Sequence, residues 1–408
     1  MEVLFITHKY PPSIGGMQKH SYELATRLRK YCSVHTIIYQ EDRSRILFFL
    51  RLKHRIKKVL KANPNIALIY LNDALMATLS IWLKKYTDLP VVASFHGLDI
   101  VFPSVIYQKW IVPKLHQLDG IIAVSRPTAE ECRKRGFDPQ KIYSISNGID
   151  HDLADQGQQV GYRKILEQKL GRSLKGKRIL MSLGRPVRRK GFCWFIKEVL
   201  PQLDSNTLFI LVGPKGNTHP ISQCLLSSLP RDLKHKVELF FGMGSDGYEL
   251  QQLLHQAPHQ DRLIHLGPQT FPDIIQIISI ADLFIVPNIK VEGDFEGFGL
   301  VALEAAICGT PVVAAQIEGL QEAIVDGKNG YGVPSENPQA WVKKIRTLLA
   351  QPDELLAFGE QARDYTMAQY DWDKMVAAYF QVFQKLTRPP LVSAVSLSSS
   401  ILDTPKPI

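Results

Sequence analysis

Two glutamates, Glu296 and Glu304, lie on either side of an expected helix start in the stretch "FEGFGLVALEAAICGTPVVA", residues 295–314. The helix is expected to begin near Phe298 or Gly299, after a glycine-bearing loop. Unpaired N–H groups at a helix start attract anions, and glycine lets a phosphate group come close to them. The segment therefore predicts a phosphate or diphosphate site with a carboxylate on each side.

A carboxylate beside a phosphate repels it unless the carboxylate has a partner of its own. The vicinal hydroxyls of a sugar are such a partner, because an ionised carboxylate accepts two hydrogen bonds at once. Glu296 on the loop and Glu304 about two turns into the helix could thus hold two sugars, one at each end of a diphosphate. This pattern indicates a nucleotide sugar. The alternative is that neither glutamate binds a ligand, with Glu296 on the surface of a loop and Glu304 on the solvent face of a helix.

The loop "SLGRPVRRKGF" carries four cations just after another strand-like run. Arg185 and Lys190 are candidates for stabilising the negative charge that develops on a departing diphosphate. Arg188 and Arg189, between them, are interpreted as solvated surface residues.

Two loops in the first half of the chain carry further candidates. "THKYPPSIGGMQKHSYELA" places Gly15 and Gly16 between an expected strand and an expected helix, and "VVASFHGLDI" ends a strand at His96. The first loop matches neither the dinucleotide-binding glycine pattern nor the P-loop, so NAD or ATP binding is not supported. His96 could donate or accept a hydrogen bond at the edge of a cleft.

Short apolar strands alternate with amphipathic helical stretches in both halves of the chain, which is typical of parallel sheets wound by helices. The length of 408 residues favours two domains. Two doubly wound α/β domains leave a cleft at the carboxyl ends of their strands, where ligands of such folds bind. Segment 214–246 fits this alternation poorly and is left unassigned.

The glutamate pair matches the E-x7-E pattern of the retaining glycosyltransferases of family 4, and the sequence resembles that family over roughly residues 1–387. The resemblance rests on "EGFGLVALEAAICGTPVVA" and on "GLQEAIVDGKNGYGV" after it. It implies the GT-B fold, with two Rossmann-like domains facing across a cleft. It also implies a hexosyltransferase that moves a sugar from a nucleoside diphosphate, UDP or GDP, to a hydroxyl of a glycan or a lipid-linked acceptor.

On this basis residues 1–165 are expected to form an acceptor-binding domain and residues 166–370 a nucleotide-sugar-binding domain. Residues 371–387 are expected to form a helix that crosses back to the first domain, and 388–408, rich in Pro and Ser, a disordered tail. The resemblance implies catalytic roles for His96, Arg185, Lys190 and Glu296. It implies donor binding by Gly15, Gly16, Arg185, Lys190, Leu266, Gly267, Glu296, Gly297, Phe298, Gly299, Leu300 and Glu304.

No metal site and no cofactor are predicted. The D-x-D patterns at residues 150–152 and 371–373 are interpreted as structural. The five cysteines are odd in number and widely spaced, which favours a reducing cytoplasm over a disulfide framework. A net charge of +10 predicts attraction to anions, but no base-stacking module accompanies it, so nucleic-acid binding is not expected.

The segment Arg43–Lys61, "RSRILFFLRLKHRIKKVLK", is predicted to be an amphipathic helix with cations along one side. It suggests peripheral docking on an anionic membrane at its cytoplasmic face. Two other functions stay open: a sugar-nucleotide epimerase or phosphorylase of the same fold, and a catalytically silent, membrane-docked subunit of a polysaccharide assembly complex.

Overall fold

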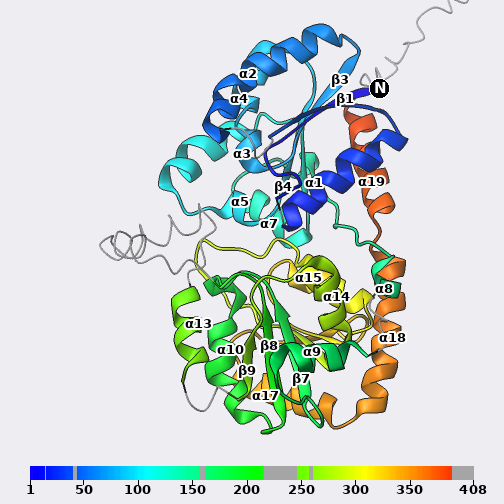
Figure 1. Ribbon diagram of the computed structural model, residues 1–408. Helices are drawn as coiled ribbons and strands as arrows, with labels where there is room; N and C mark the ends of the chain where they lie inside the picture. Colours follow the sequence, from blue (N-terminus) through cyan, green and yellow to red (C-terminus); the bar gives the residue numbers. More distant parts are fainter. Residues whose placement is uncertain (14, 40–43, 157–160, 216–245, 257–260, 388–408) are drawn as a thin grey trace, which may run out of the picture.

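The computed structural model describes residues 1–13, 15–39, 44–156, 161–215, 246–256 and 261–387. Within them the chain forms two α/β lobes, one above the other in Figure 1, each built on a six-stranded parallel sheet. Most of the unassigned segment 214–246, and the tail 388–408, lie outside the described residues.

The first sheet has the strand order β2-β1-β3-β4-β5-β6. Its strands are almost continuously apolar, because helices cover both faces of a parallel sheet. The strands are β1 Glu2–Thr7, β2 Ser33–Ile38, β3 Ile66–Leu71, β4 Val91–Phe95, β5 Gly120–Ala123 and β6 Ile142–Ser144. The helices that matter for the site and the surface are α1 Gly16–Arg27, α2 Arg45–Ala62, α4 Ser80–Tyr86 and α7 Arg126–Lys134.

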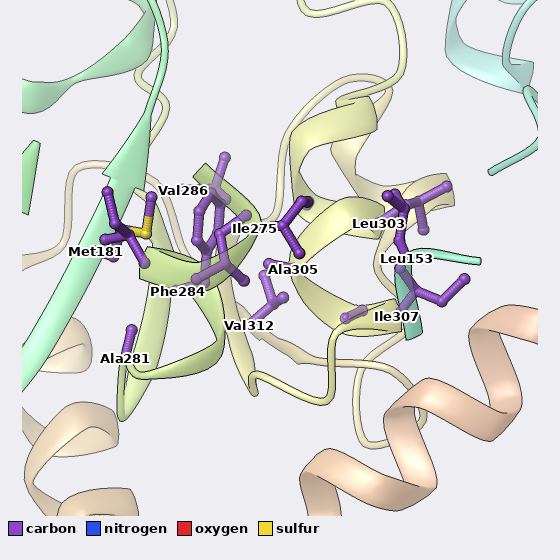
Figure 2. Packing of buried hydrophobic residues seen from close by; sticks show 14 of the residues in the cluster. Leu153, Met181, Ile275, Ala281, Phe284, Val286, Leu303, Ala305, Ile307 and Val312 are labelled. Atoms are coloured by element: carbon purple, nitrogen blue, oxygen red, sulfur yellow. The ribbon is translucent and has the colours of Figure 1, made fainter. Parts of the chain in front are cut away.

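The second sheet has the order β12-β11-β10-β7-β8-β9, the doubly wound arrangement of nucleotide-binding folds. Its strands are β7 Arg178–Leu183, β8 Thr207–Val212, β9 Leu263–His265, β10 Leu283–Val286, β11 Val312–Ala315 and β12 Tyr331–Val333. Helix α15, Leu300–Ile307, packs on this sheet. Figure 2 shows Ala305 of α15 near Phe284 of β10 and Val312 of β11 in the buried core.

Within the described ranges the chain crosses between the lobes twice. Helix α18, Pro352–Gln369, belongs to the second lobe, whereas α19, Trp372–Thr387, lies beside α1 (Figure 1). On α19, Tyr379 and Phe383 are fully buried against Phe5 and Tyr70 of the first lobe. Helix α19 therefore completes the core of the first lobe.

The first crossing lies earlier than the expected domain boundary at residue 165. Helices α8, Leu153–Gln156, and α9, Tyr162–Leu170, already pack in the core of the second lobe. Figure 2 shows Leu153 beside Leu303 and Ile307 of α15. The chain therefore passes from the first lobe to the second soon after β6, because the apolar side chains of α8 and α9 are buried in the core of the second lobe.

Candidate active site

The two lobes touch where the loops after β4 and β10 meet. A Cβ on Gly97 would lie 2.7 Å from the Cα of Gly297, and a Cβ on Gly297 would lie 1.9 Å from the carbonyl oxygen of His96. Gly97 also has φ +99°, which disfavours other residues. Any side chain at these positions would push the loops apart, so glycine permits backbone-to-backbone contact across the cleft.

The glycine loop after β1 faces the start of α15. A Cβ on Gly16 would lie 3.3 Å from Cδ1 of Leu300. Helix α15 begins at Leu300, directly after Gly299, which has φ +91°. Phe298 is buried and packs on Tyr370, so its backbone, not its ring, is what can face a ligand. The structure thus brings together two segments that the resemblance assigns to donor binding.

Glu296 lies at the centre of a compact charge cluster. Its Oε2 accepts hydrogen bonds from Lys190 Nζ at 2.6 Å and from Asn288 Nδ2 at 3.0 Å, and it also contacts Arg189. Burial alone raises the pKa of Glu296, but the charges of Arg189 and Lys190 outweigh it and hold the pKa at about 2. Glu296 is therefore ionised and can only accept hydrogen bonds.

The interpretation of Arg189 as a solvated residue is wrong. Arg189 is 9% exposed, and its Nε donates to Asp294 Oδ1 at 3.1 Å while its guanidinium also binds Glu296. A short 3-10 turn, Arg188–Lys190, closed by a left-handed glycine, directs Arg189 inward and leaves Arg188 exposed. The sequence did carry a signal for this contact. Asp294 and Glu296 lie two positions apart in "DFE", and two carboxylates so close together require a cation when they are buried.

Arg185 lies on the same loop after β7 with an exposed side chain. Lys190 is largely buried, and burial lowers its pKa although Glu296 opposes the shift. Of the two predicted cations, Lys190 donates a hydrogen bond to Glu296, and the charge of Arg185 also interacts with Glu296.

Glu304 projects from α15 toward α1 and the linker. Burial raises the pKa of the Glu304 carboxyl to about 7, although the Lys19 ammonium opposes the shift. Lys19 is already paired with Asp150 and with Glu23. Within the described ranges no hydrogen bond to the Glu304 carboxylate is found, so its acceptor capacity is available to a ligand.

His96 is held by contacts on its backbone and its ring. Its N–H donates to Asp99 Oδ1 at 2.8 Å, and its Nε2 lies 2.8 Å from the carbonyl oxygen of Asn72. Because a carbonyl only accepts, Nε2 carries the proton of this bond, and among the described residues no hydrogen bond of Nδ1 is found. His20 packs against the ring at 4.9 Å, and burial lowers the pKa of His20 to about 3.

The residues predicted to bind the base follow β9. Leu266 N–H donates to Leu211 C=O at 2.9 Å, and Gly267 C=O accepts from Gly213 N–H at 3.1 Å. Gly267 has φ +72°. These bonds fix the main chain at the ends of β8 and β9; base recognition there stays a prediction.

One group of potential metal ligands exists among the described residues. One ligand atom each from Cys193, Asp246 and Glu249 lie within 4.8 Å of one another, but Glu249 is paired with Lys197. This group is not part of the Glu296 cluster. Both predicted structural D-x-D segments are engaged elsewhere, Asp150 by Lys19 and Asp373 by Lys30.

Two family models together match most of the chain. Residues 14–153 match the model "Glycosyltransferase Family 4" and residues 164–365 match "Glycosyl transferases group 1". This chain belongs to glycosyltransferase family 4. The predicted family and GT-B fold are therefore confirmed, and so is the predicted class of enzyme, a hexosyltransferase.

Named relatives and solved structures resemble this family 4 chain to different extents. A D-inositol 3-phosphate glycosyltransferase of Corynebacterium urealyticum is 31% identical over 44% of the chain and 42% of its own length. The alpha-maltose-1-phosphate synthase of Mycolicibacterium smegmatis is 23% identical over 95% of the chain and its whole length. Anabaena HepE, solved in complex with UDP and glucose, has a TM-score of 0.70 at 20% identity and covers 94% of this chain and 100% of its own.

We expect Arg189→Ala to destabilise this transferase by about 3–5 kcal/mol, because it leaves two buried carboxylates without their shared cation. The exposed neighbour Arg188→Ala is the matched control and should change stability by less than about 1 kcal/mol, because the interactions of an exposed arginine contribute little. Urea unfolding of both variants measures the difference. Equal free energies of unfolding for the two variants would contradict the stabilising role of Arg189 in the charge cluster.

Proposed function

We propose that this family 4 enzyme transfers a hexose from a nucleoside-diphosphate sugar to a hydroxyl group with retention of the anomeric configuration. One observation carries the proposal. An ionised carboxylate, Glu296, is held by cations beside the start of α15, while Glu304 on that helix has unused acceptor capacity. This is the arrangement expected for two sugars joined by a diphosphate.

Each part of the site has a separate task. Glu296 accepts hydrogen bonds from hydroxyls of the donor hexose, and Glu304 accepts them from the ribose. Lys190, Arg185 and the N–H groups at the start of α15 neutralise the leaving diphosphate. His96 Nδ1 accepts a hydrogen bond from the donor.

Retention requires that the new bond form on the face that the leaving group vacates. The bond from the anomeric carbon to the phosphate oxygen breaks, and the acceptor oxygen binds the same face of that carbon. The acceptor proton passes to a phosphate oxygen of the departing diphosphate. Glu296 is not the proton donor, because Arg189 and Lys190 hold its pKa at about 2.

The nucleoside diphosphate of the donor is proposed to be UDP or GDP. UDP is the first to test, because Anabaena HepE was solved with UDP. The acceptor is proposed to be a hydroxyl of a glycan or of a lipid-linked glycan. The charge cluster also disfavours a catalytically silent subunit. Burying the charges of Glu296, Arg189 and Lys190 costs desolvation free energy, which an apolar cluster at the same place would avoid.

We also propose that helix α2 contacts anionic lipid through its cations. Its apolar side chains Phe48, Leu52 and Ile56 are buried in the core of the first domain and are not available to a bilayer. Ile46 and Leu50, in its first turns, are 74% and 75% exposed. No helix among the described residues is long and apolar enough to cross a membrane.

The cations of α2 support this contact. His54, Lys57, Lys58 and Lys61 line a hollow between the end of α2 and the end of α4, which also includes Tyr86. Among the described residues these three lysines form no ion pair with a carboxylate. Such uncompensated positive charge attracts phosphate-bearing headgroups.

We expect the affinity for a nucleotide sugar to be about tenfold weaker at pH 6 than at pH 8, because protonation of Glu304 below its pKa of about 7 removes the ionised acceptor. A nucleotide sugar is used because its own diphosphate does not titrate in this range. Glu304→Gln should bind weakly with a flat pH profile, measured by calorimetry. The same pH dependence in Glu304→Gln would assign the effect to another group.

The reaction itself is tested by following the anomeric proton during turnover of UDP- and GDP-sugars by NMR. An α-linked donor should give an α-linked product. Lys190→Ala should lower kcat by about 100-fold with a small change in KM, because its charge acts on the departing diphosphate. Arg188→Ala is the control on the same loop. Inverted product, or a Lys190→Ala effect on KM alone, would contradict the mechanism.

The membrane contact is tested by co-sedimentation with phosphatidylglycerol vesicles and with phosphatidylcholine vesicles at low salt. Replacing Lys57, Lys58 and Lys61 by Glu should lower binding to the anionic vesicles by at least about 100-fold, since each nearby cation contributes about 1 kcal/mol. The same replacement of the exposed Lys175, Lys328 and Lys343 in the second domain is the control. Equal binding by both triple variants would exclude α2 as the docking surface.

A further inference from the structure

The peptide backbone of Glu296 is held from a segment that the mechanism above does not use. Glu296 N–H donates to the side-chain oxygen Oε2 of Glu318 at 2.6 Å, and Glu296 C=O accepts from Gly319 N–H at 3.0 Å. Residues 318 and 319 lie between β11 and the short helix α16, Leu320–Ala323. Both polar groups of the Glu296 backbone are thus bound by two consecutive residues of this segment.

The contact is close as well as specific. A Cβ on Gly319 would lie 2.1 Å from the carbonyl oxygen of Gly297, so this segment packs directly on the loop that carries Glu296. One residue earlier, Phe295 N–H donates to Asp294 Oδ1 at 2.8 Å. Two successive N–H groups, those of Phe295 and Glu296, are therefore bound by carboxylates.

Glu318 adopts an unfavourable backbone conformation to make its bond. Its φ is +49°, in the left-handed region that residues with a side chain avoid. Among the described residues only Glu336, at φ +55°, shares this feature without being glycine. A strained residue of this kind persists where its surroundings impose it, and such residues concentrate at functional sites.

The direction of the Glu296 side chain depends on this peptide. Gly297 follows it and carries no side chain that could fix the loop, and a rotation of the peptide would swing the Glu296 carboxylate away from Lys190. The Glu318 bond opposes this rotation from the backbone side, while Lys190 and Arg189 hold the carboxylate end.

We propose that Glu318 is a positioning residue that fixes the Glu296 peptide, so that the Glu296 carboxylate meets the hydroxyls of the donor hexose. The inference rests on the proposed function. Glu318 acts through Glu296 and needs no contact with the donor. Its role is to keep one acceptor oxygen at hydrogen-bond distance from the Glu296 N–H.

Three substitutions of Glu318 separate positioning from a structural role. Glu318→Gln keeps an acceptor oxygen at the same place and should keep most of the turnover. Glu318→Ala should lower kcat by about 10- to 100-fold, because a displaced carboxylate no longer meets the donor sugar. Glu318→Gly removes the acceptor and also relieves the left-handed strain, so it should be as slow as Glu318→Ala and at least as stable as the parent enzyme.

The matched control is Glu336→Gly, which relieves the same kind of strain at an exposed position and should leave kcat unchanged. Binding of UDP or GDP without the hexose should be the same in all four variants. Parent-like turnover of Glu318→Gly or Glu318→Ala would overturn the proposal, and so would a Glu318→Gln variant as slow as Glu318→Ala. Failure of the proposed function is distinct: the parent enzyme itself would then neither bind nor turn over a nucleotide sugar.

Discussion

A carboxylate removed from water must be neutralised where it lies, and Glu296 imposes this constraint on the whole cleft. Moving an ion into a low-dielectric interior is costly unless cations and hydrogen bonds meet it there. Lys190 and Arg189 come from the loop after β7, and Asn288 from the end of β10. The requirement to neutralise Glu296 thus fixes the relative position of two loops of the second domain.

The second constraint is the close approach of the two domains. Parallel sheets place their loops at one edge, so a cleft between two such edges brings together residues far apart in the chain. The approach is tight because glycine occupies the contact points: His96 C=O lies against Gly297, and Gly16 lies against Leu300. The glycines that we propose leave room for a diphosphate also let the domains touch.

A buried hydrogen-bond network supports the first-domain side of the cleft. Tyr379 on α19 bonds to Ser94 of β4 at 3.1 Å and lies 3.4 Å from His20 Nε2, while His20 Nδ1 contacts Asn147 Oδ1 at 2.8 Å. His20 in turn packs on the ring of His96. Each polar group in this chain of contacts has a partner, which makes the network rigid. The last helix therefore supports the site as well as the core.

Local patterns of the sequence were sufficient for the class of fold, and they also predict the centre of the candidate site. The alternation of apolar strands with amphipathic helices predicts two wound parallel sheets, because each element must bury one face. The spacing of Glu296 and Glu304 around a glycine-bearing helix start predicts paired acceptors beside a phosphate site. Both inferences use residues within one or two turns of each other, where local geometry is regular.

The sequence by itself determined which residues carry charge, and the tertiary structure decided which of them face one another. Arg188 and Arg189 are adjacent in the sequence, yet only Arg189 turns inward, to a carboxylate 107 positions away. Glu318 likewise reaches Glu296 through a left-handed turn that its residue type does not favour. The sequence pattern predicts that α2 is amphipathic, and only the tertiary structure decides that the core of the first domain covers its apolar side. Side-chain direction depends on turn geometry and on long-range packing, and neither leaves a periodic signal in the chain.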